Sequence, residues 1–156
     1  MSTRYTDADL KRLQAHLEEH GTNKGFVPTP PRAKARNRES RMQQAIVKWW
    51  ACQCRAFGVP EHLWMACPLP AARTAQHGAR MKAEGVRKGT PDMFLAVKRG
   101  PCAGLWLENK TTEGVVAPEQ KAFMQDLFAF GYKVAVCRDF DEARTQIVQY
   151  LSLPHV

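Results

Sequence analysis

Apolar positions at helical spacing predict two helices in the first part of the chain. In residues 6–19, leucines three and four residues apart mark one face of a helix. A second helical pattern fills residues 37–57, with Asn37 as its cap and Gly58 as its stop. The intervening residues, 20–36, combine prolines, glycines and basic residues without an apolar period, so they predict a linker.

The whole pattern predicts an appended arm and one folded domain. The 156 residues are enough for a single compact domain with a hydrophobic core. We expect an N-terminal helix with a basic, proline-rich linker in residues 1–36 and the folded domain in residues 37–156. A short apolar run at residues 62–67 fits a strand, whereas residues 70–90 show no clear period.

The C-terminal half alternates strand-like and helix-like runs. Two apolar runs flank the turn sequence at residues 99–102 and predict a hairpin, and Pro118 stands at the first-turn position that proline favours in a helix. Asp139 with Glu142 is typical of a capped helix start. The order predicts a mixed α/β sheet flanked by helices, with a right-handed crossover before the last strand. The predicted elements cover residues 93–98, 104–110, 118–130, 132–137 and 139–151.

The charge balance indicates a polyanionic partner. Lys and Arg number 23 against 15 Asp and Glu, which gives a net charge of +8, and small, strongly basic proteins often bind nucleic acid. A solvated basic surface without a partner is the alternative. No apolar run approaches the ~18 residues of a membrane helix, and the N-terminus has no apolar signal core. The five irregularly spaced cysteines fit reduced thiols in a cytosolic protein better than a zinc site.

The polar residues of the predicted hairpin are candidates for chemistry, because strand interiors disfavour Asp, Glu and Lys. Asp92 begins the first strand, and Glu108 and Lys110 are two residues apart on the second, so the latter two share one face. Asp92 joins that face only in one register. If Lys98 pairs with Cys102 across a three-residue loop, Asp92 stands opposite the glutamate, whereas a four-residue loop puts it on the other face.

Two carboxylates brought together in this way repel each other, and a divalent cation between them removes the repulsion. Hard oxygen ligands suit Mg²⁺ or Mn²⁺, which lower the pKa of a bound water and offset charge on a phosphate. Lys110 on the same face can hold or deprotonate the attacking water and steady the phosphate. The alternative is a surface Glu–Lys pair with Asp92 as a turn residue, because the pattern D…E-x-K alone is weak.

Three short motifs follow one another along the chain: Pro91-Asp92, Glu108-Asn109-Lys110 and Pro118-Glu119-Gln120. In this order they resemble the PD element, the E-x-K element and the helix-opening element of the VRR-NUC family, a branch of the PD-(D/E)xK nuclease superfamily. The resemblance covers about residues 39–151 and implies a restriction-endonuclease-like core. Asn109 is a departure, since the family usually has an apolar residue there. This difference bears on the packing beneath the strand rather than on metal binding.

The resemblance implies a nuclease that uses Mg²⁺ or Mn²⁺ to hydrolyse DNA phosphodiesters. Lys110 would serve the water, and Gln120 would orient Lys110 or the water. The family also has a glutamate on the helix before the sheet, and Glu39 is the matching residue. Its alternative role is a first-turn glutamate favoured by the helix dipole, and the alternative for Gln120 is an ordinary exposed residue. The implied catalytic residues are Asp92, Glu108, Lys110, Glu39 and Gln120, and the implied metal ligands are Asp92, Glu108, the main-chain carbonyl of Asn109, and Glu39.

The resemblance also bears on the substrate. Small single-domain members of the family are similar to homodimeric enzymes that cut four-way (Holliday) junctions, so we expect a structure-selective endonuclease acting on branched DNA as a homodimer. The alternatives are a DNA-binding protein of the same fold without catalysis, and a nuclease for flaps or linear ends. Family analogy fits the cytoplasm of a bacterium or of a phage-infected host.

Two basic runs flank the proposed site in sequence and predict phosphate contacts without base specificity. An inert, solvated face is the alternative. The four tryptophans, Trp49, Trp50, Trp64 and Trp106, can stack on bases, but a place in the core or in a dimer interface is the preferred interpretation. The candidate DNA-binding residues are Arg36, Arg38, Arg41, Arg73, Arg80, Lys82, Arg87 and Lys88.

Overall fold

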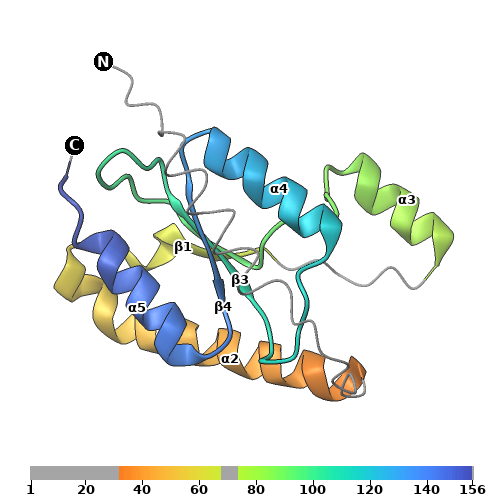
Figure 1. Cartoon of the computed structure of the whole chain (residues 1–156), viewed down its shortest axis with the longest axis horizontal. Helices are drawn as coiled ribbons and strands as arrows, with labels where there is room; N and C mark the ends of the chain where they lie inside the picture. Colours follow the sequence, from red (N-terminus) through yellow and green to blue (C-terminus); the bar gives the residue numbers. More distant parts are fainter. Residues whose placement is uncertain (1–31, 68–73, 156) are drawn as a thin grey trace.

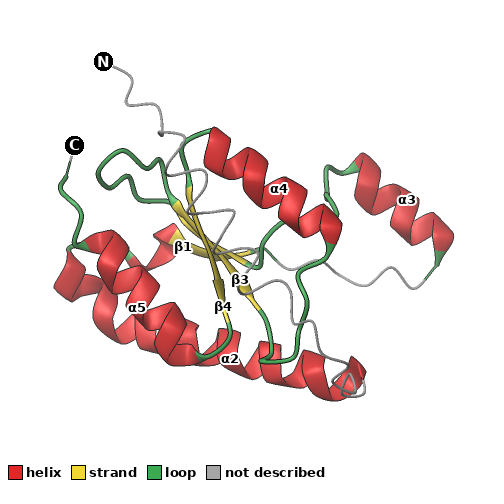
Figure 2. Cartoon of the chain, viewed as in Figure 1, coloured by secondary structure: helices red, strands yellow, loops and turns green. Residues whose placement is uncertain are grey.

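A computed structural model of the chain describes residues 32–67 and 74–155, and the side chains from residue 38 onward within those ranges. The helix predicted for residues 6–19 lies outside the described residues. Within them, the elements form a four-stranded sheet with helices on both faces, which confirms the predicted mixed α/β class (Figure 2). No helix in this part of the chain is long and apolar enough to cross a membrane.

The sheet has the strand order β1-β2-β3-β4. The first three strands are antiparallel neighbours, and β3 and β4 are parallel, so the connection between them crosses over through a helix. The β2 strand is three residues long, which is shorter than the predicted run over residues 93–98. The strands are β1 (Trp64–Ala66), β2 (Met93–Leu95), β3 (Leu105–Asn109) and β4 (Lys133–Cys137).

Helices cover the two faces of the sheet unequally. Figure 1 shows α2 and α5 on one side of the sheet, α4 on the other, and α3 standing apart from the rest. Two short 3-10 turns follow α2 before the sheet begins. The helices are α2 (Arg32–Gln53), α3 (Ala75–Ala83), α4 (Pro118–Ala129) and α5 (Phe140–Leu151), and the turns are η1 (Cys54–Phe57) and η2 (Glu61–Leu63).

The predicted start of the α2 helix is wrong. The helix begins at Arg32, five residues before the expected cap at Asn37, because residues 32–36 are Ala, Arg and Lys, which favour helix strongly. Its expected end is confirmed, since the 3-10 turn η1 leads into Gly58, which adopts a left-handed conformation with φ 66°.

The helix α3 was not predicted, because its sequence has no apolar stripe. None of its residues is buried. Its first turn is instead stabilised by Thr74, whose side chain accepts a hydrogen bond from the backbone N–H of His77 at 3.1 Å. A helix that packs so little against the domain leaves no period for sequence analysis to detect.

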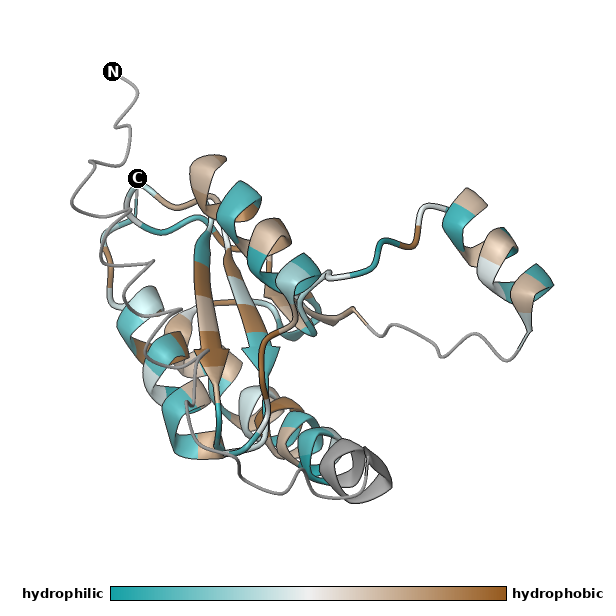
Figure 3. Ribbon diagram, turned by 45° about the vertical axis from the view of Figure 1, so that its right-hand side comes forward, coloured by the Kyte–Doolittle hydropathy of each residue, from teal (hydrophilic) through white to brown (hydrophobic). Residues whose placement is uncertain are grey.

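The strands divide the interior into two cores by the alternation of their side chains. Leu105 and Leu107 face α2 and α5 in the larger core, whereas Trp106 belongs to the smaller core under α4. Figure 3 shows the apolar strands between the more polar outer surfaces of the helices. Glu108 follows the same alternation, so it points to the α4 side of the sheet.

The starts of the last two helices agree with the sequence. Pro118 is the first residue of α4, as predicted. At α5, the Asp139 side chain accepts a hydrogen bond from the N–H of Glu142 at 2.8 Å, which confirms the cap. The Glu142 carboxylate accepts from the N–H of Arg138 at 2.7 Å instead of from Asp139, so the capping box is shifted by one residue.

The tip of the β2–β3 hairpin is held by the C-terminal segment. Arg99 is 2% exposed, and its Nε donates to the carbonyl of Leu151 at 3.3 Å. The Tyr150 hydroxyl donates to the carbonyl of Val97 at 2.5 Å, and the N–H of Gly100 donates to the carbonyl of Pro154 at 2.8 Å. The hairpin is therefore fixed at its far end by residues about fifty positions later in the chain.

Candidate active site

The register of the hairpin brings the two predicted carboxylates together. Met93 pairs with Leu107 and Leu95 with Leu105, so extending the same register by one residue sets Asp92 opposite Glu108. The required register is therefore confirmed. The predicted pairing at the tip is wrong, because Cys102 bridges Arg99 rather than Lys98 and the strands part before the turn.

Asp92 lies at the end of β2, where it bonds to both neighbouring strands. Its backbone carbonyl accepts from the N–H of Cys67 on the β1 side at 2.7 Å. Its side-chain Oδ2 accepts from the N–H of Asn109 on the β3 side at 2.8 Å. The side chain thus takes the place of a backbone partner at the end of the ladder, and this fixes the carboxylate beside β3.

Glu108 is 1% exposed, and only one of its oxygens is occupied. Its Oε1 lies 2.6 Å from Lys110 Nζ and also accepts a hydrogen bond from Gln120 Nε2. Its Oε2 is buried and has no hydrogen-bond partner among the described residues. A buried carboxylate oxygen without a partner is costly, and this oxygen is available to a water or a cation.

Gln120 is held in place by the start of α4. Its Oε1 accepts a hydrogen bond from the N–H of Ala117 at 3.0 Å, which fixes the amide so that Nε2 points at Glu108. The predicted role of Gln120 was to orient Lys110 or the water. In the structure it orients Glu108 directly, and Lys110 contacts the same carboxylate oxygen.

Burial dominates the electrostatics of the pair. Burial first, and then the negative charge of Asp92, raise the pKa of Glu108 to about 7 despite the opposing effects of Lys110 and Gln120. Burial also raises the pKa of Asp92, against the effects of the Asn109 N–H and of Lys110. The site therefore lacks positive charge for the two carboxylates that it buries.

These residues fit a hard divalent cation. The site offers the unpartnered Glu108 Oε2, the Asp92 carboxylate and a shortage of positive charge. Asn109 presents its N–H to Asp92, and because a strand residue directs its N–H and C=O to the same side, its carbonyl faces the site as well. Mg²⁺ commonly takes one or two carboxylates and completes its coordination with water.

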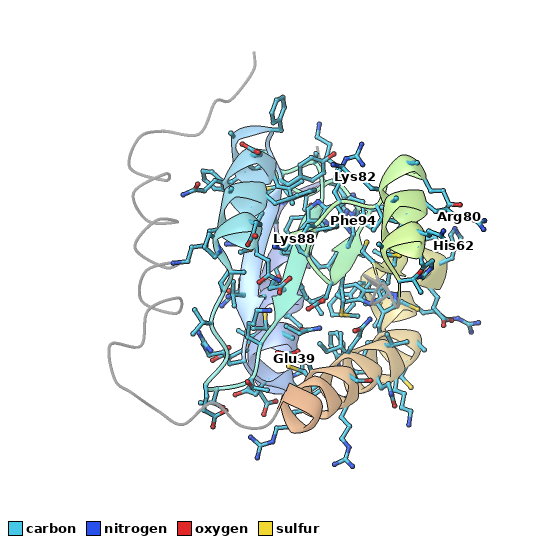
Figure 4. The ribbon with its side chains drawn as sticks, turned by 90° about the vertical axis from the view of Figure 1, so that its right-hand side faces the viewer. Glu39, His62, Arg80, Lys82, Lys88 and Phe94 are labelled. Carbon is cyan, nitrogen blue, oxygen red and sulfur yellow. The ribbon has the colours of Figure 1, made fainter. Side chains whose placement is uncertain are left out.

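The predicted third carboxylate, Glu39, is not brought into this set. Figure 4 shows it on the N-terminal half of α2. It makes no hydrogen bond or ion pair with another described residue, and no three His, Cys, Asp or Glu side chains in the described ranges are grouped closely enough to hold a metal. A role for Glu39 stays a prediction.

The side chain of Asn109 points to the opposite face, into the larger core. It is 1% exposed, its Nδ2 donates only to Met93 Sδ at 3.5 Å, and its Oδ1 has no partner among the described residues. The effect of this polar residue is therefore on the packing beneath the strand, as predicted. Its backbone contributes to the site and its side chain does not.

Arg138 organises the loop between β3 and α4, and no pattern in the sequence indicated this role. Its guanidinium donates to the carbonyls of Thr111, Thr112 and Gly114 at 2.8, 3.1 and 2.9 Å. This loop connects Lys110 to Gln120, so one arginine that follows β4 sets the spacing of two site residues. Only a contact between distant parts of the chain reveals such a role.

The basic candidates lie on exposed surface, several of them in ion pairs. Lys88 Nζ pairs with Glu119 at the start of α4, and Arg80 pairs with Glu84 at 2.7 Å. Figure 4 shows Lys88 and Lys82 between the ribbons of α4 and α3 in this view, and Arg80 on the side of α3 that is turned away from α4. Arg73 and the side chain of Arg36 lie outside the described residues. The remaining candidates with described side chains are Arg38, Arg41 and Arg87.

A glycine allows the segment before Asp92 to pack against α4. Gly89 has φ 91°, and a Cβ there would lie 2.6 Å from the carbonyl oxygen of Glu119. The basic loop that carries Lys88 is therefore in direct backbone contact with the helix that carries Gln120.

Comparisons with known proteins agree on one family. The family model for the VRR-NUC domain matches residues 37–140. A solved structure described as a VRR_NUC domain protein matches with a TM-score of 0.64 and 25% sequence identity, over 74% of this chain and 89% of that one. No curated protein matches the sequence significantly.

Proposed function

Because the chain belongs to the VRR-NUC domain family, we propose that it is a metal-dependent DNA nuclease with its active site at Asp92, Glu108 and Lys110. A nuclease is the general activity of this family. The observation that supports this site is the pairing of Asp92 with buried Glu108 on neighbouring strands, where Lys110 and Gln120 share one oxygen of Glu108 and no described residue bonds to the other.

The ion would be held by Asp92, Glu108 and the main-chain carbonyl of Asn109. When bound, Mg²⁺ or Mn²⁺ would supply positive charge that offsets charge on the phosphate and makes a water easier to deprotonate. Burial of Glu108 under α4 excludes bulk solvent from this carboxylate and strengthens its interactions with charged groups.

The remaining site residues would position the reacting groups. Lys110 contacts Glu108 Oε1 with Nζ and lies 14% exposed, so it can still reach the attacking water and a phosphate oxygen. Gln120 keeps Glu108 oriented, with Oε2 turned away from its hydrogen bond. Arg138 acts through the loop carbonyls and is a positioning residue.

DNA would approach along the exposed basic side of the molecule. The net charge of +8 and the exposed bases near α3 and α4 give sequence-independent attraction to phosphates. We propose branched DNA as the substrate, with the four-way junction as first choice and a homodimer as the active form. Two copies of one site at a fixed separation address two symmetric strands.

The decisive test is cleavage of junction, flap and linear duplex by purified protein with Mg²⁺, Mn²⁺ or EDTA. We expect metal-dependent cutting, abolished in Asp92→Asn and Lys110→Ala. Asp126→Asn, the same change at an exposed carboxylate of α4, is the matched control and should cut like wild type.

Each part of the proposal has its own contrary outcome. Cleavage in EDTA would contradict the metal dependence, and cleavage by Asp92→Asn would contradict the assignment of the active site. Equal cleavage rates on junction and linear duplex would contradict the preference for branched DNA. A monomer in sedimentation, with and without junction DNA, would remove the homodimer.

A further inference from the structure

A row of apolar side chains crosses the sheet beside the carboxylate pair. Met65 on β1 pairs with Phe94 on β2, which pairs with Trp106 on β3. All three lie on the face that carries Asp92 and Glu108, since residues directly opposite in a ladder share a face. We call these three residues the stacking face.

The stacking face extends beyond the helix that covers this side of the sheet. Trp106 packs against the core under α4, whereas Phe94 and Met65 lie outside that core. Met65 is 41% exposed on the edge strand β1, so this end of the row is open to solvent. The apolar row therefore runs from covered to open surface across three strands.

The central ring of the stacking face is held in a fixed position. The rings of Phe94 and Trp106 are stacked, with centroids 4.4 Å apart and planes 23° from parallel, and Tyr132 meets Phe94 edge-on at 5.9 Å. A Cβ at Gly104 would lie 2.6 Å from the Phe94 ring, so the glycine leaves the space that the ring occupies. The positions of both rings are thus set before any ligand arrives.

This surface is the next step along the strands from the candidate active site. Side chains two residues apart on a strand are about 7 Å apart, which is the spacing from Asp92 to Phe94 and from Glu108 to Trp106. Figure 4 shows Phe94 on the sheet, between the ribbons of α4 and α3 in this view, whereas Figure 1 shows that α3, which carries Lys82, stands apart from the sheet. An apolar surface continuous with the candidate active site, on a protein with a net charge of +8, fits a nucleotide better than a protein.

We propose that the stacking face binds an unpaired nucleobase of the substrate strand, next to the phosphate that is cut. A base reaches an aromatic surface on a sheet only after it leaves the duplex stack. The inference rests on the proposed nuclease function and specifies its substrate class, which is DNA with unpaired nucleotides at the cleavage position. A branch point or a single-stranded flap supplies such nucleotides, and uninterrupted duplex does not.

The test uses a single-stranded oligonucleotide that contains the fluorescent base 2-aminopurine, with a fully paired duplex for comparison, both in EDTA. Wild type should quench the fluorescence of the single strand. Phe94→Leu, which keeps an apolar side chain and removes the ring, should lose the quenching and bind the single strand about 10-fold more weakly. Phe130→Leu is the matched control, because Phe130 is 82% exposed at the end of α4.

A second pair of variants covers the case in which Phe94→Leu fails to fold. Met65→Glu places a charge on the exposed part of the stacking face and should weaken single-strand binding at least 10-fold, with a smaller effect on duplex. Val148→Glu makes the same kind of change on α5, where Val148 is 37% exposed, and should bind like wild type.

The contrary outcomes separate this inference from the proposed function. If Phe94→Leu and Met65→Glu bind and quench like wild type while the wild-type protein cuts DNA, the stacking face is overturned and the nuclease stands. If the wild-type protein quenches but never cuts, the nuclease proposal fails. If Phe94→Leu turns a DNA-free dimer into a monomer in sedimentation, the face is a contact between copies and the inference is overturned.

Discussion

Replacing Glu108 with glutamine should make the metal-free protein more stable at alkaline pH. The folded protein raises the pKa of this carboxyl from 4.5 to about 7, mainly through burial. A group that binds its proton more tightly when folded stabilises the fold at low pH, and this stabilisation is lost as the pH rises through the folded pKa. Glutamine keeps the shape of the side chain and has no charge to bury.

The size of the effect follows from the same pKa. A change from 4.5 to about 7 corresponds to about 3 kcal/mol in the free energy of unfolding, at ~1.4 kcal/mol per pH unit. The residue is 1% exposed, so solvent screening does not reduce this figure much. The difference in free energy of unfolding between Glu108→Gln and wild type should be complete at pH 8. It should disappear near pH 4.5, where wild type carries the proton.

Urea denaturation in EDTA measures this directly. At pH 8 the Glu108→Gln midpoint should lie ~1 M or more above that of wild type, for an m-value of about 1–3 kcal/mol/M. Adding Mg²⁺ or Mn²⁺ should raise the wild-type midpoint and leave the variant nearly unchanged, because a ligand stabilises only the form that binds it. The stability of the variant would thus be gained at the expense of its activity.

Two results would refute this reasoning. The first is a Glu108→Gln protein less stable than wild type at pH 8 in EDTA. The second is a difference between the two proteins that is the same at pH 5 and pH 8. Glu119→Gln is the control, because Lys88 lowers the pKa of Glu119 and neutralising it should bring no gain at pH 8.

Four other expectations concern single positions. Gly89→Ala should lower the free energy of unfolding by about 1–3 kcal/mol, since φ is 91° and a Cβ meets backbone, and an unchanged urea midpoint would contradict this. Arg138→Gln should slow cleavage about 10- to 100-fold by loosening the β3–α4 loop, and wild-type kinetics would disprove its positioning role. Asp139→Ala should lower the free energy of unfolding by ~1 kcal/mol through loss of the α5 cap, and an unchanged midpoint in thermal unfolding would contradict this. Exposed Cys52 should react with a thiol reagent in the native protein at pH 8, whereas buried Cys137, whose pKa is raised to about 12, should not. Mass spectrometry identifies the labelled cysteine, and labelling of Cys137 before Cys52 would contradict this prediction.

The features predicted from sequence are those with strong local signals. The proline at the start of α4 and the cap of α5 act within a few residues, so they can be identified without tertiary structure. The pairing of Asp92 with Glu108 was predicted as one of two registers, and only the three-dimensional pairing selected it. Residue types thus indicated which side chains could form a site, and only the structure gave their arrangement.

The features that sequence missed depend on distant contacts or on their absence. Arg138 binds carbonyl groups more than twenty residues earlier, which no local pattern records. The α3 helix has no buried residue and therefore no apolar period. The early start of α2 follows from helix propensity in residues 32–36, which the prolines and bases of the preceding segment obscured. Phe94 drew no attention because a strand phenylalanine ordinarily belongs to a core.

The clamp on the hairpin tip has a consequence for how the protein is made. Arg99, Val97 and Gly100 take their partners from residues 150–154, which a ribosome adds after every other element described here. Until those residues emerge, the guanidinium of Arg99 has no α5 carbonyl to bind. We therefore expect the nascent domain to stay incompletely folded, and unable to cut nucleic acid, until residues 150–154 have emerged from the ribosome.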